Sequence, residues 1–145
     1  SSFNSQTKEC GCGILIRQLI PNGIKETRLQ IKDDAVDNNQ AELKAIYHAS
    51  GHIKGLPKDE PIFIITDSMI AIESILYSGT KKDKYREYGE RIRSMLYCEN
   101  WRIYHKKAHT NNNDRYSIRQ AIADKLAKGA RWKKADNYTA LSLWT

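Results

Sequence analysis

The sequence lacks the features that would place it in a membrane or in the secretory pathway. No run approaches the ~20 apolar residues that span a bilayer, and the polar start, SSFNSQTKE, has no hydrophobic segment of a signal peptide. Cysteine is scarce, because Cys10, Cys12 and Cys98 are an odd number without CxxC spacing. We therefore expect reduced thiols in an intracellular protein of the cytoplasm or nucleus, with no membrane partner.

Internal repeats and low-complexity linkers are also absent from the sequence, so nothing divides it into separate units. At 145 residues, the chain is long enough to bury a core without disulfides. Its 40 % apolar and 28 % charged residues are ordinary for a globular protein. We expect one domain over residues 1–145.

The positive charge is concentrated near the C-terminus. Residues 1–100 contain 14 Lys/Arg and 14 Asp/Glu, whereas residues 101–145 contain 10 Lys/Arg and 3 Asp/Glu, which accounts for the whole net charge of +7. Residues 131–145 are expected to form a basic and aromatic tail. A one-ended basic excess indicates a polyanion partner such as nucleic acid, with a solvated basic surface as the alternative.

Apolar periodicity predicts a layered α/β domain. The expected strands are Cys12–Ile20 and Ile24–Lys32, joined by a turn at 21–23 as a hairpin, then Pro61–Asp67 and Trp101–Lys107. The expected helices are Asn39–Lys54 (N-cap Asn38 or Asn39), a helix after Asp67 to about Tyr77, Lys82–Leu96 and Arg115–Gly129. This order predicts a mixed sheet, antiparallel at the start and parallel around 61–67, with no complete first strand before the hairpin.

Asp67 ends an apolar run, PIFIITD, that reads as a strand covered on both faces. A bare charge at a buried position is costly unless it is paired or metal-bound. In open α/β sheets, ligands gather at the carboxyl ends of strands. Asp67 is therefore a candidate for a ligand-binding carboxylate.

Two more carboxylates fall on apolar faces of predicted helices. Glu42 opens the stripe that continues through Ala45 and Ile46, and Asp124 lies among the apolar residues of 121–127. Each of the three acids taken alone is more readily read as a surface acid or an ion-pair partner, but three acids that end or face the same sheet indicate a common site. Clustered carboxylates raise each other's pKa unless a cation is present, and Mg²⁺ prefers oxygen ligands.

Three segments carry a resemblance to a known family. DNNQAEL (37–43), IITDS (64–68) and HKKAHTNNN…AIADKLAKGA (105–130) resemble the motifs of the type 1 ribonuclease H family in their order along the chain. The resemblance implies a ribonuclease H-like α/β fold, with a mixed central sheet and helices on both faces. It also implies cleavage of the RNA strand of RNA–DNA hybrids.

Residue roles follow from this resemblance. It implies that Glu42, Asp67 and Asp124 are catalytic carboxylates holding two Mg²⁺ or Mn²⁺ ions, about 4 Å apart in a two-metal site. By the same resemblance, His109 would assist product or proton handling, and Asn38 and Asn39 would contact the substrate. An amide side chain both donates and accepts, so it can recognise a ribose 2′-hydroxyl.

The family's fourth carboxylate, on the first strand, has no counterpart in this sequence. Either Ser1 and Ser2 follow an Asp-Gly that lies upstream, or Asn4 stands in the acid's place. The second alternative predicts weaker metal binding and a domain that binds without cutting. A DNA-cutting recombinase of the same fold is a further alternative, which Asn38 and Asn39 argue against.

The segment 78–100 mixes acidic and basic residues, so the basic handle of some cellular members is missing. We expect other cations to grip the substrate, namely Lys106, Lys107, Arg115, Arg131, Lys133 and Lys134. The domain could stand alone or form part of a larger polyprotein, such as the reverse transcriptase of a virus or retroelement.

Overall fold

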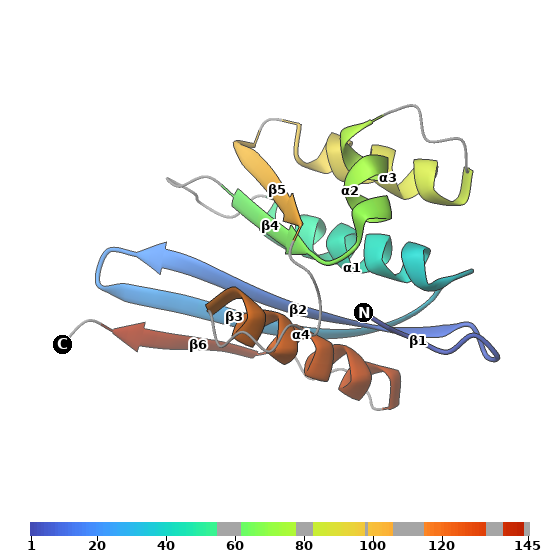
Figure 1. Cartoon of the computed structure of the whole chain (residues 1–145). Helices are drawn as coiled ribbons and strands as arrows, with labels where there is room; N and C mark the ends of the chain where they lie inside the picture. The colour runs from blue at the N-terminus through green and yellow to red at the C-terminus, as the bar shows by residue number, and fades with distance from the viewer. Residues whose placement is uncertain (55–61, 78–82, 98, 106–114, 133–137, 144–145) are drawn as a thin grey trace.

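The computed structural model in Figure 1 describes residues 1–54, 62–77, 83–97, 99–105, 115–132 and 138–143. Their elements are, in order, β1 (Ser2–Phe3), β2 (Glu9–Ile20), β3 (Gly23–Asp34), α1 (Asn38–Ile53), β4 (Ile62–Thr66), α2 (Met69–Leu76), α3 (Asp83–Met95), β5 (Trp101–His105), α4 (Arg115–Trp132) and β6 (Tyr138–Leu143). The strand order of one sheet is β1-β2-β3-β6, all antiparallel, and β4 pairs with β5 in parallel.

The long hairpin of β2 and β3 forms the base of the molecule. Its register runs without interruption from Glu9 opposite Asp34 to Ile20 opposite Gly23. The sequence predicts this hairpin with shorter arms. Its outer ends carry acidic residues, which are depleted in strands, and the pairing continues through them because the partner strand is already in register.

Both edges of the hairpin carry strands that the sequence does not predict. β1 pairs with β2 through Ser2 and Phe3, so a short first strand does precede the hairpin. β6 pairs with β3 over Gly23–Arg28. Part of the expected basic and aromatic tail, residues 138–143, is therefore a strand that covers the outer edge of β3.

Helix α1 lies between two apolar clusters. Leu43 and Ile46 belong to the first cluster, together with residues of α2 and α3. Ala41 and Ala45 belong to the second cluster, together with Cys10 and Cys12 of β2. The two alanines give this face little bulk, which lets the helix lie close to the hairpin. The cap corrects an expectation, because Asp37, and neither Asn38 nor Asn39, caps the helix.

The Asp37 side chain makes this cap by accepting a hydrogen bond from the backbone N–H of Gln40, and Asp37 itself has extended φ and ψ. Asn38 and Asn39 are therefore placed in the first turn of α1, one turn before Glu42.

The parallel pair β4 and β5 packs against the helices α1, α2 and α3 through its inward residues. Ile62 and Ile64 of β4, with Trp101 and Ile103 of β5, pack against the cluster that includes Ile75. β4 ends at Thr66, so the predicted strand is confirmed and Asp67 directly follows it.

Helix α4 lies on the face of the hairpin opposite α1 (Figure 1). Successive side chains of a strand point to opposite faces of the sheet. Cys10 and Cys12 therefore face α1, and a Cβ added to Gly13 would point the other way and meet the backbone of α4. The glutamine side chain of Gln30, on β3, also donates to the carbonyl oxygen of Leu126 at 3.0 Å.

The observed architecture confirms the expected α/β class, with antiparallel and parallel strands and helices on both faces. Among the described residues, the antiparallel strands and the parallel pair form two sheets, where the sequence predicts one mixed sheet. The predicted helices correspond to α1, α2, α3 and α4, although α4 continues past 129 to Trp132. Cys10 and Cys12 are buried free thiols. Within the described residues, no helix combines the length and apolar character needed to cross a membrane.

Candidate active site

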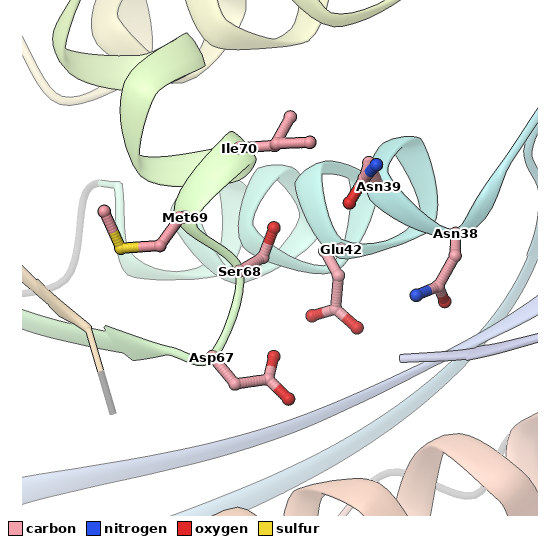
Figure 2. A pocket seen from close by; sticks show the side chains of 7 residues that line it. All are labelled: Asn38, Asn39, Glu42, Asp67, Ser68, Met69 and Ile70. Atoms are coloured by element: carbon pink, nitrogen blue, oxygen red, sulfur yellow. The ribbon is translucent and has the colours of Figure 1, made fainter. Parts of the chain in front are cut away.

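A pocket of about 340 Å³ opens where the end of β4 meets the start of α1. Its lining residues are Asn38, Asn39, Glu42, Asp67, Ser68, Met69 and Ile70. Figure 2 shows the carboxylates of Glu42 and Asp67 pointing into the same space, from α1 and from the end of β4. The structure thus brings together two of the three carboxylates that the sequence singles out.

Asp67 is held by its neighbours on both sides. The Ser68 hydroxyl caps α2 by accepting from the N–H of Ala71 at 3.1 Å, and the Ser68 N–H donates to the Thr66 hydroxyl at 3.2 Å. The backbone carbonyl oxygen of Asp67 accepts from His105 Nε2 at 3.2 Å. These contacts fix the turn and leave the half-buried carboxylate directed at the pocket.

Glu42 is partly enclosed, with 17 % of its side chain exposed. The Ser1 hydroxyl donates to Glu42 Oε1, and the Ser1 amino group lies 3.5 Å from the same oxygen. A carboxylate at this depth requires such partners. The polar groups of the first-strand segment that meet Glu42 are therefore those of Ser1.

Asn4, the proposed stand-in for the missing acid, lies elsewhere. Its side-chain oxygen accepts from the N–H groups of Gln6 at 2.9 Å and Thr7 at 3.2 Å, which stabilises the turn between β1 and β2. Asn4 is not among the residues that line the pocket. The geometry therefore gives Asn4 a role in the turn.

Asp124 lies half-buried on α4, on the far side of the hairpin from α1, and it does not line this pocket. Among the residues that the structure describes, no three His, Cys, Asp or Glu side chains are grouped so that they could hold a metal ion. The convergence of Asp124 with Glu42 and Asp67 stays a prediction.

Several other predicted residues fall outside the description. His109, Lys106, Lys107, Lys133 and Lys134 lie outside the described residues. Arg115 and Arg131 belong to α4, but their side chains are outside the described part of the chain. Their predicted roles in substrate binding, and that of His109 in turnover, stay predictions.

The sequence does not single out four residues that the structure places at or beside the pocket: Ser68, Met69, Ile70 and His105. The first three directly follow Asp67, and a helix that starts where a strand ends presents its first turn at the same edge. Their position directly after Asp67 in the sequence is therefore enough to predict that they lie at this edge. His105 ends a strand that pairs in parallel with β4, opposite Thr66, and only the register reveals its position.

The comparisons with known proteins agree with this architecture. Residues 1–131 match the family model described as RNase H, so the chain belongs to the RNase H family. A search of curated proteins found no match.

Among solved structures, the fold is similar to LC9-RNase H1, described as a type 1 RNase H with the type 2 active-site motif, with a TM-score of 0.72, 14 % identity, and coverage of 92 % of this chain and 68 % of that one. It is also similar to the protease-reverse transcriptase of Prototype Foamy Virus (TM-score 0.60, 21 % identity, 85 % of this chain and 20 % of that one). The solution structure of the PFV RNase H domain matches with a TM-score of 0.56, 19 % identity, and coverage of 86 % and 94 %. At these identities, the likeness concerns the fold.

Proposed function

We propose that this protein hydrolyses the RNA strand of RNA–DNA hybrids in a reaction that depends on Mg²⁺ or Mn²⁺. The observation that carries the proposal is the pocket in which the carboxylates of Glu42 and Asp67 meet beside the amides of Asn38 and Asn39. Membership of the RNase H family supports it. The acids would hold metal, and the amides would contact the substrate.

The donor atoms of the pocket fit a hard divalent cation. Mg²⁺ is commonly held by one or two carboxylates together with substrate phosphates, and Glu42 and Asp67 supply two. Asp124 is the third proposed ligand. When bound, two ions would supply Lewis-acid stabilisation to the attacking and leaving oxygens of an in-line phosphodiester displacement.

Substrate recognition would come from the first turn of α1. Asn38 is exposed and Asn39 half-buried at the pocket, so both amides are accessible to a ribose hydroxyl. Such a group can donate to and accept from a 2′-hydroxyl, which distinguishes RNA from DNA. The basic residues of 101–145 would contribute charge that attracts phosphates.

Hydrolysis of a labelled hybrid tests this function. RNA–DNA hybrid, DNA duplex and RNA duplex of one sequence are incubated with the protein in Mg²⁺, and products are resolved by length. We expect cleavage of the RNA strand of the hybrid alone, lost with EDTA and with Glu42→Gln. Cleavage of the DNA duplex at the same rate would instead support a DNA-cutting enzyme.

The alternative is a module of the same fold that binds hybrid without cutting it. The observation that favours it is the absence of a carboxylate from the described first-strand segment, where Ser1 stands beside Glu42. Under this alternative, the protein binds hybrid, and Mg²⁺ produces no cleavage. Cleavage gained when Asp-Gly is placed before Ser1 would support the nuclease, whereas cleavage gained with Asn4→Asp would support the degenerate module; the place of Asn4 in the turn argues against the second result.

We also propose that residues 1–145 act as one domain within a larger polyprotein. The similarity to a viral protease-reverse transcriptase, of which this chain covers 20 %, supports this proposal. A single protease-resistant fragment that contains the hairpin and α4 together would be the expected result of limited proteolysis. Independent release of the two parts would contradict the single domain.

A further inference from the structure

The first turn of α1 is tied to the start of α3 by the carboxylate of Asp37. One oxygen, Oδ1, caps α1 through the Gln40 N–H at 2.8 Å. The other, Oδ2, accepts from the Tyr85 hydroxyl at 2.6 Å and from Lys84 Nζ at 2.5 Å. A charged acceptor makes these hydrogen bonds strong, so the two helix starts are held together at one point.

Tyr85 is well placed to act as a fixed support. Its side chain is 3 % exposed and belongs to the apolar cluster of Leu43 and Ile92, so the ring cannot swing away. A second contact joins the same helices, because Gln40 Nε2 donates to the Lys84 carbonyl oxygen at 3.0 Å. The position of the Tyr85 hydroxyl is therefore set by packing.

The same hydroxyl reaches the pocket through Asn39. The Tyr85 hydroxyl donates its hydrogen to Asp37 Oδ2, and its oxygen accepts a hydrogen bond from Asn39 Nδ2 at 3.4 Å. With the nitrogen directed at Tyr85, the amide oxygen of Asn39 is left toward the pocket, and Figure 2 shows it on that side. The chain of hydrogen bonds thus selects one of the two orientations of this amide.

We propose that Tyr85, supported by Asp37, is a positioning residue that aims the Asn39 amide oxygen as an acceptor for the 2′-hydroxyl of an RNA strand. This role rests on the proposed function. Tyr85 does not line the pocket. Its effect is to remove the wrong orientation of the amide before the substrate arrives, because a preorganised group loses less freedom on binding.

Tyr85→Phe tests the role, because it removes the hydroxyl and keeps the buried ring. Tyr88→Phe is the matched control, a tyrosine one turn later on the same helix whose ring packs at the edge of the same cluster. Binding of RNA–DNA hybrid and of DNA duplex is measured in EDTA, so that no cleavage changes the substrate. We expect the preference for hybrid to fall about 5-fold in Tyr85→Phe, the size of one net hydrogen bond, and to be retained in Tyr88→Phe.

A double-mutant cycle separates positioning from stability. In an Asn39→Ala background, Tyr85→Phe should cause no further loss of preference, since the amide that it aims is gone. A Tyr85→Phe protein that melts at a lower temperature and keeps the full preference well below that temperature would overturn the positioning role.

A measurement on the free protein keeps the two proposals distinguishable. The side-chain ¹⁵N amide signals of Asn39 should move in Tyr85→Phe and stay in place in Tyr88→Phe, and unchanged signals in both would overturn the role. A wild-type protein that binds hybrid and DNA duplex equally would overturn the proposed function, and the recognition role of Tyr85 with it.

Discussion

The carbonyl oxygen of Ala123 lies 2.0 Å from the position that a Cβ on Gly13 would occupy. The backbone nitrogen of Ala127 is 2.3 Å from the same point. Leu126 Cβ lies 2.9 Å from it, so helix α4 lies directly on the backbone of β2 at Gly13, and Asp124 is the residue that follows Ala123. The close approach of α4 to β2 is therefore possible only because residue 13 is a glycine and has no Cβ.

Gly13→Ala should destabilise the fold, because neither backbone can move aside for the added methyl. We expect a loss of about 1–3 kcal/mol in the free energy of unfolding, the usual cost of overpacking, measured by urea denaturation. Gly51→Ala is the matched control. A Cβ there would meet Met95 Sδ at an ordinary 3.8 Å, and alanine favours the helix by roughly 0.5–1 kcal/mol. Equal effects at both sites would contradict the close contact.

Asp67→Asn should remove hydrolysis of hybrid and leave the fold intact, because it removes charge from a proposed metal ligand without changing its size. A Lewis-acid contribution of several kcal/mol corresponds to roughly 10³-fold or more in rate. Glu73→Gln, an exposed acid on α2, is the control and should keep its activity. If both variants lost less than about tenfold, Asp67 would be structural.

His109→Ala should slow turnover by about 10- to 100-fold, at or below the low end for lost acid–base assistance. Because His109 is not proposed to hold metal, the Mg²⁺ concentration for half-maximal rate should be unchanged. A Mg²⁺ titration of the rate in both proteins checks this. A strong shift in Mg²⁺ dependence would assign His109 to the metal ligands.

Asp37 predicts an acid-dependent loss of stability. Burial acts to raise its pKa, but hydrogen bonds from Lys84, Tyr85 and the Gln40 N–H outweigh burial, and the pKa is lowered. A lowered folded-state pKa gives stability that is present above the unfolded value of about 3.9 and is lost as pH falls through the folded value. The stability difference between wild type and Asp37→Asn should therefore be constant near neutral pH and shrink below about pH 4, followed by urea unfolding. A difference that grew on acidification would contradict the sign.

Binding of hybrid should weaken steeply with salt, because the basic residues of 101–145 would neutralise phosphates. Each neutralised phosphate adds about −0.7 to −0.9 to the slope of log K against log salt. Removing the charges of Lys133 and Lys134 together should make the slope shallower by nearly two such contributions. Lys25→Gln on the hairpin is the control and should leave the slope unchanged. A slope that did not change would place the phosphate contacts elsewhere.

The sequence predicts the elements whose signals are local. The continuous apolar run that ends at Asp67 and the stripe that begins at Glu42 correspond to β4 and α1. β1 and β6 are missed for another reason. Two residues are too few for a periodic signal, and β6 owes its form to the unpaired edge of β3, which lies far away in sequence.

At the pocket, residue types were easier to predict than their arrangement. Apolar patterns single out Glu42 and Asp67, and the resemblance to the ribonuclease H family adds Asn38 and Asn39; all four line the pocket. The link from Asp37 to Tyr85 joins two helices whose spacing is set by tertiary packing. A local sequence pattern therefore cannot predict the hydrogen bond between Asp37 and Tyr85.

The two sheets share no ladder of hydrogen bonds among the described residues. Glu42 and Asp67 therefore stand on opposite sides of a seam, one on the helix that rests on the hairpin and the other at the end of the parallel pair. Their separation is maintained by interdigitated side chains such as Leu43 and Ile75, and such packing yields when a methyl group is lost. Trimming Ile75, which is not among the residues that line the pocket, should therefore change the separation of the two carboxylates.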